Sequence, residues 1–189
     1  KNVIMNNFEP TIDFIKSQFI GQEFIPLHAP HFGGNEKKYL LETIDSTFVS
    51  SVGAFVNRFE SMMQEITNAY KGIAVVNGTA GLQVALRLVG VNNGDEVITQ
   101  GLTFVATANA IAYNNAFPIF LDVDIDTMGL SPVAVAEFLD EYAELRNGVC
   151  FNKKTNRKIA ACMPMHTFGF PVHLDELLVI CNNWNIPIV

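Results

Sequence analysis

Charged residues are scarce in this chain of 189 residues, and their scarcity excludes several classes of protein. Asp, Glu, Lys and Arg make up 16% of the sequence, hydrophobic residues make up 49%, and the net charge is −7. A negatively charged chain is poorly suited to grip the phosphate backbone of a nucleic acid over a broad surface. So little charge predicts that much of the surface is covered, by another subunit or by further chain.

Long apolar runs and signal-like segments are missing too. No run approaches the ~18 consecutive apolar residues that a membrane-spanning helix needs. The segment from Lys1 to Asn7 is too polar for a secretory signal. The three cysteines, Cys150, Cys162 and Cys181, are far apart in the sequence and lack the spacing of metal ligands. These features predict reduced thiols in a cytoplasmic protein.

The motifs of common nucleotide and metal sites are also absent. Gly78-Thr79-Ala80-Gly81 is not followed by the Lys of a Walker loop, and its glycines lack the G-x-G-x-x-G spacing. His28 and His31 have no third ligand nearby in the sequence, and Asp122 and Asp124 have no third acidic partner. We therefore expect no metal site.

One stretch, from Ile73 to Leu86, predicts a strand that passes through a tight turn directly into a helix. Residues 73–76 form a short apolar run typical of a buried strand, and apolar residues recur at helical spacing after Thr79. The turn leaves the amides of Gly78, Thr79 and Ala80 without helical acceptors, beside the positive end of the helix dipole. It is a candidate site for an anion, most often a phosphate. An ordinary turn, with Thr79 as the helix cap, is an equally good interpretation.

Helices and strands alternate along the rest of the chain. Helices are expected over residues 8–19, 36–44, 55–70, 104–113, 131–145 and 174–183. The helix over residues 55–70 should turn one apolar face inward, comprising Phe55, Phe59, Met62, Met63 and Ile66. Further strands are expected over residues 96–99, 116–121, 158–164 and 186–189, and a polar loop over residues 146–157. Strands separated by helices predict an α/β fold with a mostly parallel central sheet.

Residues that could carry chemistry gather at the predicted C-terminal ends of the strands, where ligands bind in such sheets. The turn at Gly78 is one, and Phe104, the segment Asp122–Asp124 and His166 are the others. Phe104 could stack on a planar ring or be an ordinary core residue. The aspartates could serve as acid/base groups or cap a turn. His166 could be a base or a hydrogen-bonded loop residue.

The order of these segments resembles the DegT/DnrJ/EryC1/StrS family, the sugar aminotransferases that use pyridoxal 5′-phosphate. The resemblance runs from about Pro26 to the end of the chain. It rests on Ser51–Gly53, Phe59–Glu60, Asn77–Leu82, Gly94–Ile98, Thr103–Ile111, Pro118–Asp124, Met165–Gly169 and Ile186–Val189. The polar loop, which carries Cys150, resembles the branch that makes precursors of nonulosonic acids such as legionaminic acid.

The resemblance implies the large α/β domain of a fold-type I transferase, truncated before the catalytic lysine, in a homodimer with shared active sites. Gly78, Thr79 and Ala80 match the family's phosphate-binding turn. Phe104 matches the aromatic residue that stacks on the pyridine ring of pyridoxal 5′-phosphate, and His166 lies in the loop over the cofactor.

The N-terminal part of the chain is expected on the substrate side. Residues 1–54 should form N-terminal helices and a substrate-side loop, and residues 55–189 a partial cofactor-binding domain. The loop over residues 26–34 is the candidate contact for the sugar, with His31 and Phe32 as its substrate-binding residues.

The implied reaction transfers an amino group from glutamate to a nucleotide-linked 4-keto-6-deoxy sugar, in the synthesis of surface polysaccharides or nonulosonic acid precursors. In the family, a lysine forms the Schiff base and an aspartate pairs with the pyridine nitrogen. Both are expected beyond Val189, so no catalytic residue is assigned here and the chain alone is expected to be inactive. A cofactor-dependent sugar dehydratase of the same family and a non-catalytic ligand-binding fragment remain as alternatives.

Overall fold

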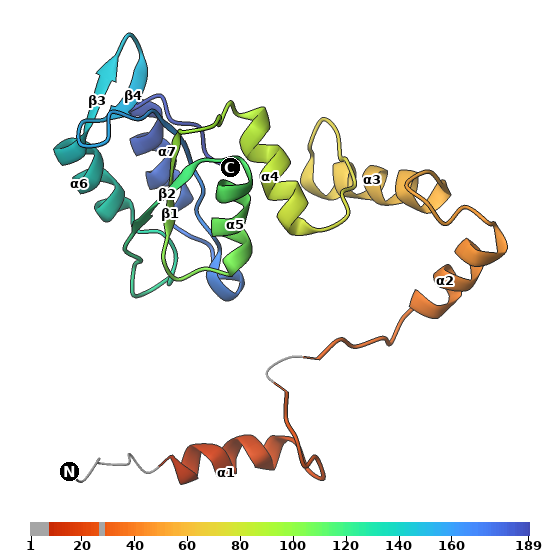
Figure 1. Cartoon of the computed structure of the whole chain (residues 1–189). Helices are drawn as coiled ribbons and strands as arrows, with labels where there is room; N and C mark the ends of the chain where they lie inside the picture. Colours follow the sequence, from red (N-terminus) through yellow and green to blue (C-terminus); the bar gives the residue numbers. More distant parts are fainter. Residues whose placement is uncertain (1–7, 27–28) are drawn as a thin grey trace. The chain divides into compact units, whose positions relative to one another are not determined.

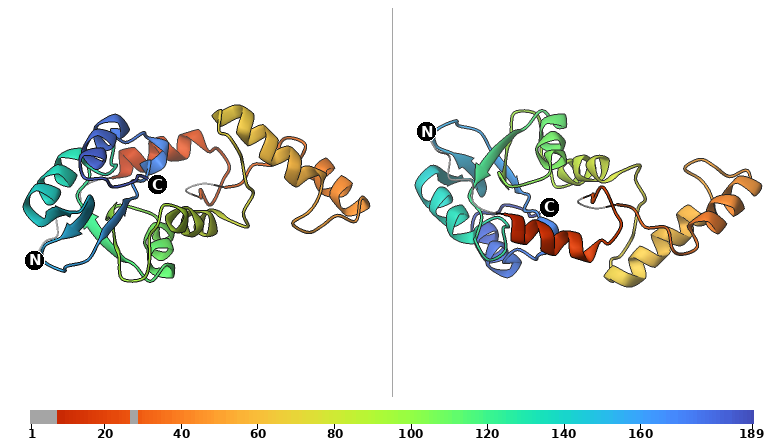
Figure 2. Two further views of the ribbon diagram at one scale, coloured as in Figure 1. Left: turned by 90° about the horizontal axis from the view of Figure 1, so that it is seen from above. Right: turned by 90° about the horizontal axis from the view of Figure 1, so that it is seen from below.

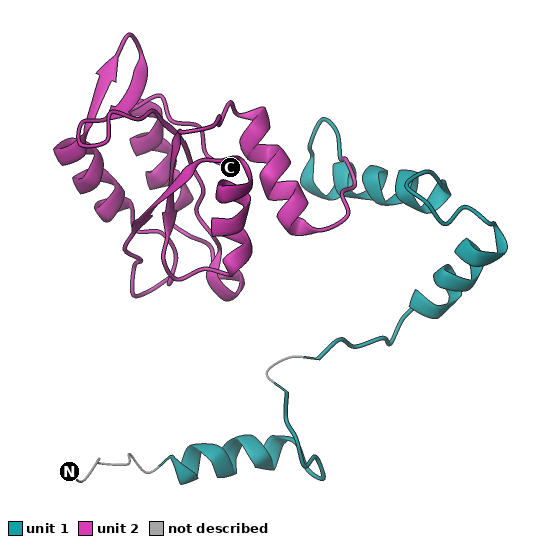
Figure 3. Cartoon of the chain, viewed as in Figure 1, with its two compact units in different colours: residues 1–72 teal, residues 73–189 magenta. Residues whose placement is uncertain are grey.

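The computed structural model describes residues 8–26 and 29–189, which fall into two compact units, residues 1–72 and residues 73–189 (Figure 3). The expectations for residues 1–7 and for His28 lie outside the described residues. The expected division into a substrate-side part, residues 1–54, and a cofactor-binding part, residues 55–189, stays a prediction.

Unit 1 holds three helices, all close to their predicted positions: α1 (Glu9–Gln18), α2 (Glu36–Asp45) and α3 (Ala54–Thr67). None of the three buries a residue in the described part of the unit. Only Phe55 of the expected inward face has a ring contact, with Tyr39 of α2 at 5.3 Å between ring centroids. The predicted inward packing is wrong for four residues, which are exposed: Phe59, Met62, Met63 and Ile66. A helix buries its apolar face only where another element covers it, and amphipathic spacing alone does not supply that element.

Unit 2 is built on a parallel sheet in which β1 (Glu96–Gln100) lies between β2 (Phe117–Leu121) and β5 (Ile159–Cys162). Beyond β5, the expected strand over residues 186–189 is reduced to one parallel bridge, between Cys162 and Ile188. The expected strand over residues 73–76 is wrong, because that segment has no strand conformation in the structure and is largely exposed. A short apolar run becomes a strand only beside a partner that accepts its hydrogen bonds.

Four helices complete unit 2 and confirm the predicted order (Figure 1). Helices α4 (Gly78–Leu88) and α5 (Val105–Tyr113) pack against each other, as do α6 (Pro132–Tyr142) and α7 (Leu174–Asn183). Figures 1 and 2 show the two pairs on opposite sides of the sheet. In the described part of the chain, no helix has the length and apolar character that crossing a membrane requires.

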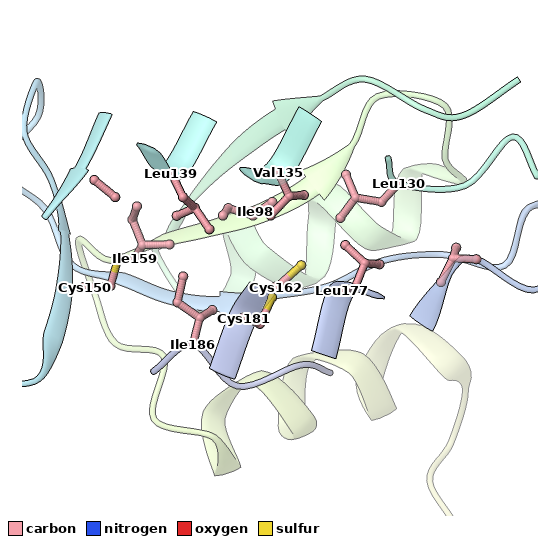
Figure 4. Close-up of a cluster of buried hydrophobic side chains, with 12 residues drawn as sticks. Ile98, Leu130, Val135, Leu139, Cys150, Ile159, Cys162, Leu177, Cys181 and Ile186 are labelled. Carbon is pink, nitrogen blue, oxygen red and sulfur yellow. The ribbon is translucent and has the colours of Figure 1, made fainter. Parts of the chain in front are cut away.

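Alternation along β1 explains why both faces of the sheet are covered. Successive residues of a strand point to opposite faces. Val97 joins a core cluster that includes Leu86 of α4, whereas Ile98 joins the cluster of Leu139 from α6 and Leu177 from α7 (Figure 4). All five side chains are fully buried. Both faces of the predicted parallel sheet therefore have an apolar core.

The segment after α6 differs from the prediction. The helix begins as expected, with Ser131 as its cap and Pro132 at its first position, but it ends at Tyr142. The next residues form the hairpin of β3 (Ala143–Arg146) and β4 (Val149–Asn152) in place of the expected loop. Asn147 and Gly148 turn the hairpin with φ of 51° and 80°. This Asn-Gly pair is the sequence signal that could have predicted it, since such turns require positive φ at both positions.

All three cysteines are free and buried in unit 2. Burial raises the pKa of the Cys150 thiol to about 12. Since the thiolate is the reactive form, this cysteine has a structural place in the core.

Candidate functional site

A pocket of about 370 Å³ lies between the loop after β1 and the loop after β5. It is lined by Leu102, Thr103, Phe104, Met165, His166, Thr167 and Phe168. Its volume is in the range of sites for small molecules. Adjacent parallel strands end at the same edge of a sheet, so their loops meet there. The structure thus brings together two residues that the sequence indicated separately, Phe104 and His166.

Phe104 is presented to the pocket by its place at the start of α5. It is the residue before the helix, in an extended conformation, and its carbonyl accepts the amide of Thr107 at 3.0 Å. Its side chain is 72% exposed. An ordinary core phenylalanine would be buried, and Phe104 is exposed in this chain. An exposed ring in a pocket wall has a face available for stacking.

His166 is held by a hydrogen bond within its own loop. The amide of Val172 donates to its Nδ1 at 3.2 Å. This bond requires an unprotonated Nδ1, so the neutral ring carries its proton on Nε2. The interpretation as a hydrogen-bonded loop residue fits this contact, and Nε2 then offers a donor.

Phe168 is a pocket residue to which the sequence analysis assigned no role. It lies in the left-handed region, with φ of 53° and ψ of 20°, and its side chain is 88% exposed. For a bulky residue this conformation is an outlier that costs roughly 1–3 kcal/mol. The turn is closed by the amide of Gly169, which donates to the His166 carbonyl at 3.0 Å. No feature of the sequence marks the strain, because an aromatic residue before a glycine is compatible with many loops.

The helix N-terminus at Gly78 has a cap that the sequence analysis did not identify. The side-chain oxygen of Asn77, not Thr79, accepts a hydrogen bond from the Ala80 amide, at 2.9 Å. Among the described residues, no protein group accepts a hydrogen bond from the amides of Gly78 and Thr79. An anion at this end of α4 would therefore meet two amides and the Thr79 hydroxyl, while Ala80 already has a partner. Figure 1 shows the first turns of α4 and α5 at the same end of unit 2.

A second group of polar residues lies where β2 leads towards α6. Asp124, Asp126 and His173 hold their side-chain polar atoms within 4.8 Å of one another. The sequence analysis considered Asp122 and Asp124 and found no third acidic partner for them. The fold instead places Asp126, and His173 from the start of α7, beside Asp124. His173 Nε2 lies 3.0 Å from an Asp126 carboxylate oxygen, in an exposed ion pair. Asp122 caps its own turn, because its carboxylate accepts the amide of Val123 at 2.8 Å.

The Asp126–His173 pair predicts a shifted histidine titration. Their hydrogen bond raises the pKa of His173 above 6.5 and lowers the pKa of Asp126 below 3.8. The pair therefore stabilises the fold most fully between pH 3.8 and pH 6.5. Its contribution is lost as the pH rises through the folded pKa of His173, or falls through that of Asp126.

An NMR titration of the His173 ring checks this prediction. Asp126→Asn should bring its pKa down towards 6.5, whereas Asp175→Asn, a control in the same helix turn, should leave it in place. An unchanged pKa in Asp126→Asn would contradict the assignment of the ion pair as the cause.

Unit 2 has parallel strands, helices on both faces of the sheet and a pocket at the C-terminal edge of the strands, which is where α/β proteins bind their ligands. The model of the DegT/DnrJ/EryC1/StrS aminotransferase family matches residues 30–189, and the chain belongs to this family. The predicted family and fold class are thereby confirmed.

Two curated relatives illustrate the match. EpsN of Bacillus subtilis strain 168, assigned as a pyridoxal phosphate-dependent aminotransferase, is 35% identical over 165 residues, which are 87% of this chain and 40% of EpsN. GDP-perosamine synthase of Escherichia coli O157:H7 is 32% identical over 167 residues, which are 88% of this chain and 42% of the synthase. The chain thus spans about two fifths of the length of these relatives.

Solved structures agree with this assignment. The crystal structure of 3-amino-5-hydroxybenzoic acid synthase matches with a TM-score of 0.70 at 27% identity, over 87% of this chain and 39% of that one. The structure of DesI in the presence of its TDP-sugar product matches with a TM-score of 0.63 at 27% identity, over 80% and 34%.

Proposed function

We propose that the complete protein is an aminotransferase that uses pyridoxal 5′-phosphate to move an amino group from glutamate to a nucleotide-linked 4-keto-6-deoxy sugar. The observation that carries the proposal is the exposed ring of Phe104 in a pocket at the C-terminal edge of the sheet, in a chain of this family. The names of GDP-perosamine synthase and of DesI with its TDP-sugar product support a nucleotide sugar as substrate.

The residues present fit the cofactor. Its phosphate would be held by the amides of Gly78 and Thr79 and by the Thr79 hydroxyl, since these donors have no protein acceptor among the described residues. Ala80 would contribute a small side chain beside the phosphate. The ring would lie on Phe104, and His166, which lines the same pocket, would have its Nε2 proton available for a ligand. When bound, the cofactor supplies an electron sink that lets an amino group be exchanged for a carbonyl.

The remaining parts of the proposal concern substrate and assembly. His31 and Phe32 belong to unit 1, where Phe32 is exposed, and we assign them to sugar binding. We further propose a cytoplasmic homodimer with shared active sites. Many large apolar side chains are exposed in both units, which supports coverage by a second subunit.

A product assay tests the function. The complete protein should convert a nucleotide-linked 4-keto-6-deoxy sugar and glutamate to an amino sugar and 2-oxoglutarate, both detectable by mass spectrometry. Borohydride should fix the cofactor covalently to the protein. Loss of water from the sugar with no covalent fixation would instead identify the dehydratase of the family, and absence of bound cofactor would identify a non-catalytic protein.

Phe104→Ala tests the stacking assignment separately. Removal of the ring should weaken cofactor binding by roughly 1 kcal/mol, the usual worth of an aromatic pair. Equilibrium dialysis of the apoprotein against pyridoxal 5′-phosphate measures the change. Phe117→Ala, in an aromatic residue that is 45% exposed at the N-terminal end of β2, away from the pocket, should leave the affinity unchanged. Equal affinities for Phe104→Ala and the unaltered protein would mean that the ring does not contact the cofactor.

A further inference from the structure

Gln100 is the last residue of β1, and its side chain is fully buried. Its side-chain oxygen accepts two backbone amides from different loops. The amide of Leu130, in the segment before α6, donates at 2.8 Å, and the amide of Met165, in the loop after β5, donates at 3.0 Å. Both acceptor positions of the amide oxygen are thus used.

The nitrogen of the same side chain holds the other side of the pocket. Gln100 Nε2 lies 2.9 Å from the Leu102 carbonyl oxygen, 2.9 Å from Thr167 Oγ1 and 3.2 Å from the Met128 carbonyl oxygen, so one of its two N–H groups is shared between two acceptors. Thr167 Oγ1 in turn donates to the Met128 carbonyl at 2.7 Å. One side chain therefore ties together the loops that follow β1, β2 and β5.

These bonds reach the pocket directly. Leu102, Met165 and Thr167 all line it, and all three are bonded to Gln100. Thr167 lies between His166 and Phe168 in the chain, so its anchor fixes both neighbours. The strained turn at Phe168 is thus attached to the end of β1 through Gln100.

The arrangement concentrates the contacts of one buried amide on the loops around the pocket. Burying an amide is unfavourable unless its hydrogen bonds are replaced, and here the replacements come from the loops that follow three strands of the sheet. The preceding residue, Thr99, is equally buried but makes a single side-chain hydrogen bond, to the Met163 carbonyl at 2.8 Å. This bond links β1 to the residue that follows β5. Of these two residues, only Gln100 forms hydrogen bonds with residues that line the pocket.

We propose that Gln100 is a positioning residue, which fixes the loop of Phe104 relative to the turn of His166 and Phe168 and thereby sets the orientation of a planar ring bound in this pocket. The proposal rests on the proposed function, because it takes pyridoxal 5′-phosphate as the bound ring. Gln100 itself touches three loops and acts on the ring only through them.

The test compares Gln100→Leu and Gln100→Glu with the control Thr99→Val in the complete protein. Gln100→Leu removes every bond, so the amides of Leu130 and Met165 should exchange hydrogen about tenfold faster by NMR. Gln100→Glu keeps the oxygen acceptors and loses the donors, so those two amides should stay protected. Thr99→Val should leave their exchange within about twofold.

The visible circular dichroism of bound pyridoxal 5′-phosphate supplies the second readout, because it reports how the ring is oriented. Both Gln100 variants should change this signal at full cofactor occupancy, and Thr99→Val should not. An unchanged signal in both Gln100 variants, or unchanged exchange in Gln100→Leu, would overturn the proposal. If Gln100→Leu does not fold, Gln100→Glu decides by the circular dichroism signal. If the unaltered protein binds no cofactor, the proposed function fails, while the exchange data still decide whether Gln100 holds the loops.

Discussion

Thr79→Glu should abolish retention of pyridoxal 5′-phosphate by the complete protein, with at least a hundredfold loss of affinity. The new carboxylate would lie in the first turn of α4, beside the amides of Gly78 and Thr79 that are proposed to bind the phosphate. The introduced carboxylate and the cofactor phosphate would both be negative and close together, so they would repel each other strongly. The longer side chain would also occupy the space that the phosphate needs. The fold should not suffer, because a carboxylate at a helix N-terminus is stabilising by about 0.3–1 kcal/mol. The measurement is the cofactor content after dialysis, together with a thermal melt.

Gln83→Glu is the matched control for this substitution. It places the same charge on the same helix, one turn further on, where the influence of the helix end has faded. Cofactor retention should be unaffected. If Thr79→Glu kept its cofactor, or if Gln83→Glu lost it equally, the phosphate would not bind at the start of α4.

Leu139→Ala should lower the free energy of unfolding by about 3 kcal/mol. Leu139 of α6 is fully buried in the cluster that joins Ile98 of β1 to Leu177 of α7 (Figure 4). Removal of its isobutyl group loses the burial of those carbons and leaves a cavity between sheet and helices. Urea unfolding followed by circular dichroism measures the difference.

Leu88→Ala serves as the control, since Leu88 ends α4 with 81% of its surface exposed. Its replacement should change stability by less than about 0.5 kcal/mol. A similar loss in both variants would show that the cluster around Leu139 does not contribute as a packed core.

The elements of unit 2 were largely predictable because their signals are local. Ser131 and Pro132 mark the start of α6 by their own chemistry, and the structure places them as cap and first residue. The alternation of Val97 and Ile98 is a property of the strand alone. The prediction of a strand at residues 73–76 was wrong for the opposite reason. An apolar run indicates that a segment can be buried, but whether it pairs with another strand depends on the arrangement of the whole sheet.

The site was predictable only in part. Phe104 and His166 could be found because each follows a predicted strand. Gln100 and Phe168 could not, since a glutamine at a strand end and an aromatic residue before a glycine are common. Their importance comes from contacts across 28 to 67 residues of sequence in the case of Gln100, and from a backbone conformation in the case of Phe168.

Asn77 sets a limit on what the start of α4 can offer a ligand. Its side-chain oxygen accepts the hydrogen bond of the Ala80 amide, so this amide is not available to a ligand. Because the cap is a residue of the chain itself, the first turn stays helical when the ligand leaves. The cap also leaves one amide fewer to bind the phosphate. The apoprotein should therefore keep this first turn ordered and exchange its cofactor without refolding the helix.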